Sequence, residues 1–171
     1  MTTLSQSEML ALWRRNLGLE PRRTDCSITA YEGIDIDDII LRQMRRWYLN
    51  LLDTLDPHLI PTADVAARAA ISPRQGGGCE VKPPVGVRRP LTVKLRGWQF
   101  HAPVLRNVSP ERLGSFRSPF LKPGPRTPLA VLSPDGTILA FPAGDVIEEL
   151  RAVIDPGPDT YTLDESLLPL P

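Results

Sequence analysis

The sequence is poor in the residues that most often carry out chemistry. Its 171 residues include two cysteines and two histidines, and 6% of its side chains are aromatic. A nucleophilic cysteine needs a base, but no motif links Cys26 or Cys79 to His58 or His101. Zinc sites usually contain a close ligand pair of the CxxC or HxxxH kind, which these four residues do not form. We therefore expect no catalytic residues, no metal and no cofactor.

Long hydrophobic runs are also missing. No apolar stretch approaches the roughly 20 residues that a membrane-spanning helix needs. The N-terminus lacks the basic region followed by an apolar run that marks a secretory signal. Two widely separated cysteines are too few for a disulfide scaffold. These absences predict a soluble protein that is not secreted, has no membrane partner and keeps its thiols reduced.

One glycine run resembles part of a phosphate-binding loop. Gly76, Gly77 and Gly78 precede Cys79, and the chain then continues Glu-Val-Lys-Pro-Pro. A phosphate loop follows a strand, ends in Lys-Ser or Lys-Thr and opens a helix whose N-terminus binds the anion. After these glycines the sequence has neither a Lys-Ser or Lys-Thr pair nor the start of a helix. We therefore interpret the glycine run as a flexible loop before the first strand.

Proline and charge are abundant and unevenly distributed. Most of the 19 prolines follow Pro57, which predicts short strands and fixed turns in the rest of the chain. The net charge is zero, but residues 1–67, 68–126 and 127–171 carry −3, +10 and −7. Of the 20 basic residues, 17 are arginine, which suits interface ion pairs. The pattern fits either a nucleic-acid face with an acidic tail or complementary patches that join copies of the chain.

The first third of the chain has helical patterns. Ser5 and Glu8 form a capping-box signature, and the helix that they start should end at Gly18 with Met9, Leu10, Trp13 and Leu17 buried. A second helix is predicted over 35–55, and a short third one over Thr62–Ala70. The buried stripe expected along the second helix comprises Ile36, Ile39, Ile40, Gln43, Met44, Trp47, Leu51 and Leu55.

The remainder has β patterns. Leu91, Val93 and Leu95 alternate with polar residues, which predicts a half-buried strand. Residues 129–132 and 137–141 flank Ser-Pro-Asp-Gly, which predicts a hairpin. Local signals over Asp145–Ile154 slightly favour a helix. The fold class predicted is α+β, with a short helical bundle over 1–72, a small antiparallel β region over 73–158 and an extended proline-rich tail over 159–171. Together these parts form one composite domain.

The β segments resemble a family of viral proteins. Residues 81–93, VKPPVGVRRPLTV, resemble the "strand, Pro, two residues, hydrophobe-Arg, strand" passage of tailed-phage head–tail adaptor proteins of the podovirus neck and tail-gatekeeper kind. The Pro-led hairpin over 128–142 and the segment 146–156 follow in the order that this family has. The chain departs from the family in its short helical region and its Pro83-Pro84 pair. The resemblance implies a strand over 145–154, where local signals favour a helix.

The resemblance implies a non-enzymatic ring protein. Such proteins form rings of identical subunits, commonly dodecamers, between the portal protein and the tail or a second ring protein, where they retain packaged DNA and attach the tail. The implied localisation is the virion, and the host cytoplasm during assembly. The charged segments and the tail then supply the candidate interface residues, which are Arg88, Arg89, Arg96, Arg106, Arg117, Arg126, Glu148, Glu149, Asp159, Tyr161, Leu163, Leu167 and Leu168.

Three other classes of function stay open from the sequence. A nucleic-acid-binding module would use the basic middle segment, Arg74 to Arg126, with Trp98 and Phe100 near a groove. A small bacterial interaction protein would have the same composition. A hydrolase or transferase would need a catalytic constellation that two histidines and two cysteines do not visibly supply.

Overall fold

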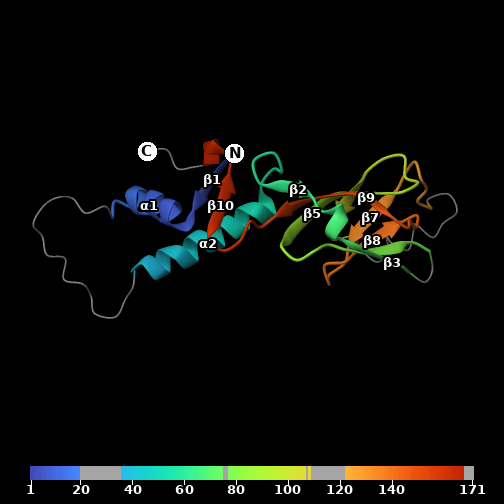
Figure 1. Cartoon of the computed structure of the whole chain (residues 1–171), viewed down its shortest axis with the longest axis horizontal. Coiled ribbons are helices and arrows are strands. Elements are labelled where there is room, and N and C mark those ends of the chain that lie inside the picture. Colours follow the sequence, from blue (N-terminus) through green and yellow to red (C-terminus); the bar gives the residue numbers. More distant parts are fainter. Residues whose placement is uncertain (20–35, 75–76, 107, 109–121, 168–171) are drawn as a thin grey trace, which may run out of the picture. The chain divides into compact units, whose positions relative to one another are not determined.

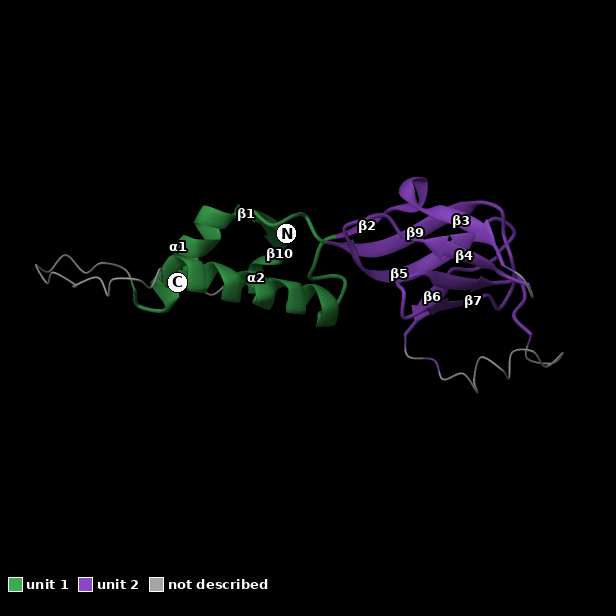
Figure 2. Ribbon diagram, turned by 90° about the horizontal axis from the view of Figure 1, so that it is seen from below, with its two compact units in different colours: residues 1–61, 155–171 green, residues 62–154 purple. Residues whose placement is uncertain are grey.

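The structure is a computed structural model that describes residues 1–19, 36–74, 77–106, 108 and 122–167 (Figure 1). The chain forms two compact units. Unit 1 comprises Met1–Pro61 together with Asp155–Pro171, and unit 2 comprises Thr62–Ile154 (Figure 2). Because the chain leaves unit 1 and returns to it, the C-terminal residues belong to the same unit as the N-terminus.

Unit 1 begins with strand β1 (Thr2–Ser5) and helix α1 (Gln6–Asn16). The predicted capping box is confirmed: the Ser5 amide donates to the Glu8 carboxylate, and the Glu8 amide donates to the Ser5 hydroxyl. Helix α1 ends where predicted, since Gly18 has a φ of +68°. The amide of Leu19 then donates to the carbonyl of Arg14, which satisfies one of the last helical carbonyls.

Helix α2 spans Ile36–Thr54, close to the predicted range. Its buried side chains are Ile40, Met44, Tyr48 and Leu52, each four residues from the next. The prediction of the buried stripe was therefore right for Ile40 and Met44. Further along the helix the buried residues are Tyr48 and Leu52, each next to a predicted one, and at its start Ile36 and Ile39 are exposed. The displacement arises because the Tyr48 hydroxyl finds hydrogen-bond partners inside unit 1, so that this polar-tipped ring is buried.

The C-terminal segment is part of the fold of unit 1. Strand β10 (Thr160–Leu163) pairs antiparallel with β1, with Thr2 opposite Leu163, and the short 3₁₀ helix η2 (Glu165–Leu167) follows. Tyr161 and Leu163 are both buried. The prediction of an extended tail from residue 159 was therefore wrong, because its alternating apolar residues have a strand partner at the other end of the chain.

Unit 2 contains an eight-stranded sheet in the order β2-β9-β5-β6-β7-β8-β4-β3. All neighbours are antiparallel except the parallel pair β6 and β7. The strands are β2 (Thr62–Asp64), β3 (Ala70–Pro73), β4 (Cys79–Lys82), β5 (Val87–Leu95), β6 (Ala102–Leu105), β7 (Leu129–Leu132), β8 (Ile138–Phe141) and β9 (Ile147–Ile154).

The sheet of unit 2 must curl, because its two edge strands are neighbours in the sequence. Laid flat, eight strands would separate the edge strands by about 34 Å. Strand β2 ends at Asp64 and β3 begins at Ala70, and that length of chain spans about 20 Å at most. The linker includes the 3₁₀ helix η1 (Ala66–Arg68), and Val65 packs into the core with residues of β4, β5, β8 and β9. The curl can be followed in Figure 2.

The predicted fold class was wrong, because strands dominate the structure. The described residues contain two α-helices, and the β part is an eight-stranded curled sheet instead of a small region. The third helix predicted over Thr62–Ala70 is replaced by β2, η1 and β3. The segment 145–154, for which local signals favoured a helix, contains β9, as the resemblance implied. Strand β9 is paired along both edges, with β5 and β2, and this pairing outweighs the helical spacing of its apolar residues.

Two other β predictions were right. Val93 and Leu95 of β5 are fully buried, and Ser133–Gly136 forms the turn between β7 and β8, where the Gly136 amide donates to the Ser133 carbonyl. Gly77 and Gly78 lie between β3 and β4, so the prediction that the glycine run precedes the first strand was wrong, and Gly76 lies outside the described residues. Gly78 has a φ of +104°, and a Cβ there would lie 2.5 Å from the Phe141 ring. This residue is therefore required for a close approach of the backbone to a side chain.

Candidate interaction surfaces

The residues that the sequence singled out for chemistry do not gather into one site. Within the described residues, no group of three or more His, Cys, Asp or Glu side chains is placed to hold a metal ion. Cys79 is buried in the core of unit 2, and this burial raises the pKa of its thiol. His101 lies 2.7 Å from the Glu149 carboxylate, while His58 is exposed in unit 1. Cys26 lies outside the described residues.

The predicted interface residues are divided between the two units. In unit 2, Arg88 and Arg89 lie on β5, Arg96 directly follows it, Arg106 directly follows β6, Arg126 precedes β7, and Glu148 and Glu149 lie on β9. In unit 1, Asp159 precedes β10, Tyr161 and Leu163 lie on it, and Leu167 ends η2. Arg117 and Leu168 lie outside the described residues.

The acidic residues next to and on β9 have partners within the same chain. The Lys94 ammonium lies 2.8 Å from the Glu148 carboxylate, and Glu149 contacts His101. Arg96 lies 3.5 Å from Asp145. These pairs are at least partly exposed, and such pairs contribute about 0–1 kcal/mol each. Glu148 and Glu149 are therefore already engaged inside unit 2.

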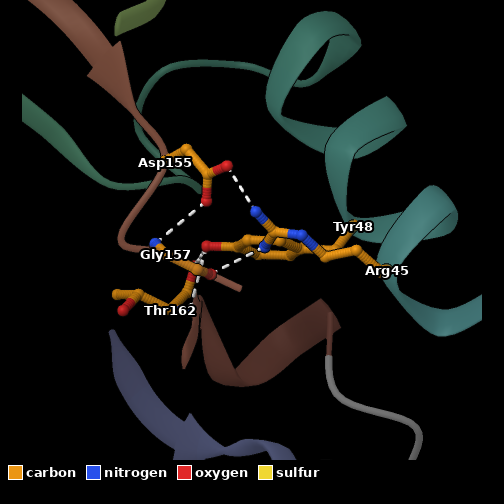
Figure 3. A network of polar contacts seen from close by, with 5 residues as sticks. All are labelled: Arg45, Tyr48, Asp155, Gly157 and Thr162. Carbon is orange, nitrogen blue, oxygen red and sulfur yellow. Dashed lines mark hydrogen bonds and ion pairs between the residues drawn. The ribbon is translucent and has the colours of Figure 1, made fainter. Parts of the chain in front are cut away.

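A polar network fastens the returning chain to α2 in unit 1 (Figure 3). The Arg45 guanidinium forms a salt bridge with Asp155 and donates to the Gly157 carbonyl at 2.9 Å. The Tyr48 hydroxyl donates to the Thr162 carbonyl at 3.2 Å and accepts from the Thr162 amide at 3.1 Å. Burial is the main cause that raises the pKa of Tyr48. The network satisfies backbone groups of the last strand and is therefore structural.

The two units carry opposite net charges. Over their full sequences, unit 1 has 7 basic and 13 acidic residues, and unit 2 has 13 basic and 7 acidic residues. Their net charges are therefore −6 and +6. The uneven charge along the sequence therefore corresponds to a difference between the two folded units. The acidic segment after Ile154 belongs to unit 1, which makes that unit negative.

An apolar hollow of about 310 Å³ lies on unit 1. It is lined by Trp13, Asn16 and Leu17 from α1 and its C-terminus, Trp47 from α2 and Leu167 from η2, and we call it the Trp hollow. The Trp13 and Trp47 rings meet edge to face, with centroids 5.7 Å apart. Leu17 is 56% exposed. Burial was predicted for Trp13, Leu17 and Trp47, and the prediction was wrong for Leu17, because α1 and α2 pack so that the end of α1 borders the hollow.

Comparison with known proteins adds no relative. Protein-family models, curated protein sequences and solved structures give no significant match to this chain. None of the described helices is both long enough and apolar enough to span a membrane.

Proposed function

We propose that this chain is a non-enzymatic structural protein whose copies associate head to tail, with unit 1 of one copy against unit 2 of the next. The observation that carries this proposal is the division of charge, −6 on one compact unit and +6 on the other. Opposite charges on two different surfaces of one chain favour a heterologous contact, and heterologous contacts repeat around closed rings.

The resemblance of residues 81–93 and 128–142 to tailed-phage adaptor proteins supports a specific version of this proposal, in which the assembly is a ring in a virus particle. In that version the ring sits between the portal protein and the tail or a second ring protein, retains packaged DNA and attaches the tail. The protein would be found in the virion, and in the host cytoplasm during assembly.

The test compares two charge reversals that change the whole chain equally. Arg106→Glu/Arg126→Glu lowers the charge of unit 2 from +6 to +2, whereas Arg15→Glu/Arg42→Glu lowers that of unit 1 from −6 to −10. All four arginines are exposed. Native mass spectrometry and light scattering at low and high salt measure association. We expect the first pair to weaken it several-fold and the second pair to maintain or strengthen it, since exposed charges contribute about 0–1 kcal/mol each. Equal effects, or a wild-type chain that stays monomeric, would overturn the proposal.

A second candidate, a nucleic-acid-binding module, is favoured by the net positive charge of unit 2. Against it, Trp98 is buried with its indole N–H bound to the Pro142 carbonyl at 3.1 Å, and so does not present its face to a base. Phe100 is 61% exposed. Fluorescence anisotropy with duplex DNA decides between the two: steeply salt-dependent binding that Arg106→Glu/Arg126→Glu removes, while self-association persists, would favour this candidate.

A further inference from the structure

The turn that joins β4 to β5 carries an apolar side chain fully into solvent. The Val87 amide donates to the Pro84 carbonyl at 3.3 Å, and Gly86 has a φ of +94°, as the third residue of a type II turn requires. Val85, at the second position of this turn, is fully exposed. Pro83 and Pro84 restrict the backbone before it. We call residues 83–87 the Val85 turn.

The Val85 turn and the Trp hollow have complementary chemistry. Surface turns are usually polar, whereas Val85 is apolar and fully exposed. The Trp hollow, in turn, places two tryptophans, two leucines and Asn16 around a space that no described side chain fills. A rigid apolar tip and an apolar hollow are the two parts that a well-packed contact needs, because fixed geometry lowers the entropy cost of association.

The units that carry the two features also have complementary net charges. The Val85 turn is flanked by Lys82 and Arg88, both exposed, within the unit of charge +6. At the Trp hollow, Asp164 and Glu165 precede Leu167, while Arg14 and Arg15 of α1 lie between Trp13 and Asn16 in the sequence. The unit as a whole has a net charge of −6. A second copy of the chain therefore supplies a partner that matches the hollow in apolarity and unit 1 in net charge.

We propose that the Val85 turn of one copy inserts into the Trp hollow of the next copy. This inference rests on the head-to-tail association proposed above and assigns its apolar contact. Since the inserted turn and the receiving hollow are different surfaces of the same chain, each copy can insert into one neighbour and receive another. Such a contact continues from copy to copy, and it closes into a ring where the rotation between neighbouring copies allows closure.

The test is a charge swap between the two surfaces, measured by sedimentation and light scattering on the full chain over a range of concentrations. Val85→Asp places a carboxylate on the tip, and Leu17→Lys places an ammonium at the hollow. Each single variant should raise the dissociation constant about tenfold or more, as for residues at the centre of an interface. The double variant should recover to within about threefold of the wild type, since the new charges then pair.

The matched control is Phe100→Asp, which makes the same kind of change at another exposed apolar residue of unit 2. It should associate like the wild type, and all variants should melt like the wild type because the altered side chains are exposed. If the wild type associates and either single variant does so equally well, the insertion is wrong while the proposed head-to-tail function stands. Weakening by Phe100→Asp to the same degree, or no recovery in the double variant, also overturns the insertion. A wild type that never associates overturns both proposals.

Discussion

Tyr48 on α2 and Tyr161 on β10 pack edge to face, with their ring centroids 5.0 Å apart and their planes at 65°. Both side chains are fully buried. The pair joins the middle of the longest helix described to the last strand of the chain, and the neighbouring Thr162 is bound through both of its backbone groups by the Tyr48 hydroxyl. The C-terminal strand is therefore held by packing as well as by its pairing with β1.

Removal of the Tyr48 hydroxyl should destabilise unit 1. Tyr48→Phe leaves the partly buried amide and carbonyl of Thr162 without this partner, which costs about 1–3 kcal/mol. Urea unfolding followed by far-UV circular dichroism of the helices measures the loss. Tyr161→Phe is the matched control, because no hydrogen bond of the Tyr161 hydroxyl is found among the described residues, and it should cost less. Equal losses for the two variants would contradict the role assigned to the Tyr48 hydroxyl.

Alkaline pH should weaken unit 1 through the same two tyrosines. Burial is the first cause that raises the pKa of Tyr48 and of Tyr161 above the ordinary 10.0. The folded state favours the neutral phenols, so their contribution is fully present below pH 10.0 and is lost as pH rises through the raised values. The unfolding free energy of the wild type should therefore fall more steeply above this pH than that of Tyr48→Phe/Tyr161→Phe. Parallel pH profiles would exclude these groups as the cause.

Deletion of residues 159–171 should unfold unit 1 and leave unit 2 folded. The deletion removes the buried Tyr161 and Leu163, the partner of β1, and the Asp159 carbonyl that accepts from the Gln6 amide at 2.9 Å. Circular dichroism should lose its helical signal, while hydrogen exchange should keep the strands of unit 2 protected. A truncated chain with intact helices would mean that β10 is dispensable.

The features that the sequence predicted correctly are those whose cause is local. The capping box of Ser5 and Glu8 is complete within one turn, and the β7–β8 turn depends on residues 133–137, whose hydrogen bonds are with one another. By contrast, β9 and β10 exist because of strands far away in the sequence, and neighbouring residues carry no sign of those partners. Pattern alone therefore favoured a helix for the first and a free tail for the second.

The candidate interaction surfaces were likewise predictable only in part. Trp13, Leu17 and Trp47 were recognised from helical spacing, but whether they fill a core or border a hollow depends on the packing of α1 against α2. Tyr48 was missed because its hydroxyl placed it outside the apolar pattern. The segregation of charge was visible in the sequence, yet its assignment to folded units required the return of the chain at Asp155.

Two neighbouring residues of α2 should differ in their effect on stability. Met44 is fully buried, and Met44→Ala should lower the unfolding free energy of unit 1 by about 2–5 kcal/mol. Trp47 is only partly buried and borders the Trp hollow, so Trp47→Ala should cost less than full removal of a core side chain. Its edge-to-face contact with Trp13 contributes about 0.5–1.5 kcal/mol in addition to the apolar area that the ring buries. Urea unfolding of both variants, followed by circular dichroism, measures the difference.

Association between copies should be weakened more by Trp47→Ala than by Met44→Ala, because Trp47 borders the proposed docking surface and Met44 does not. If Trp47→Ala proves the more destabilising variant and associates normally, Trp47 belongs to the core and the Trp hollow has no part in assembly.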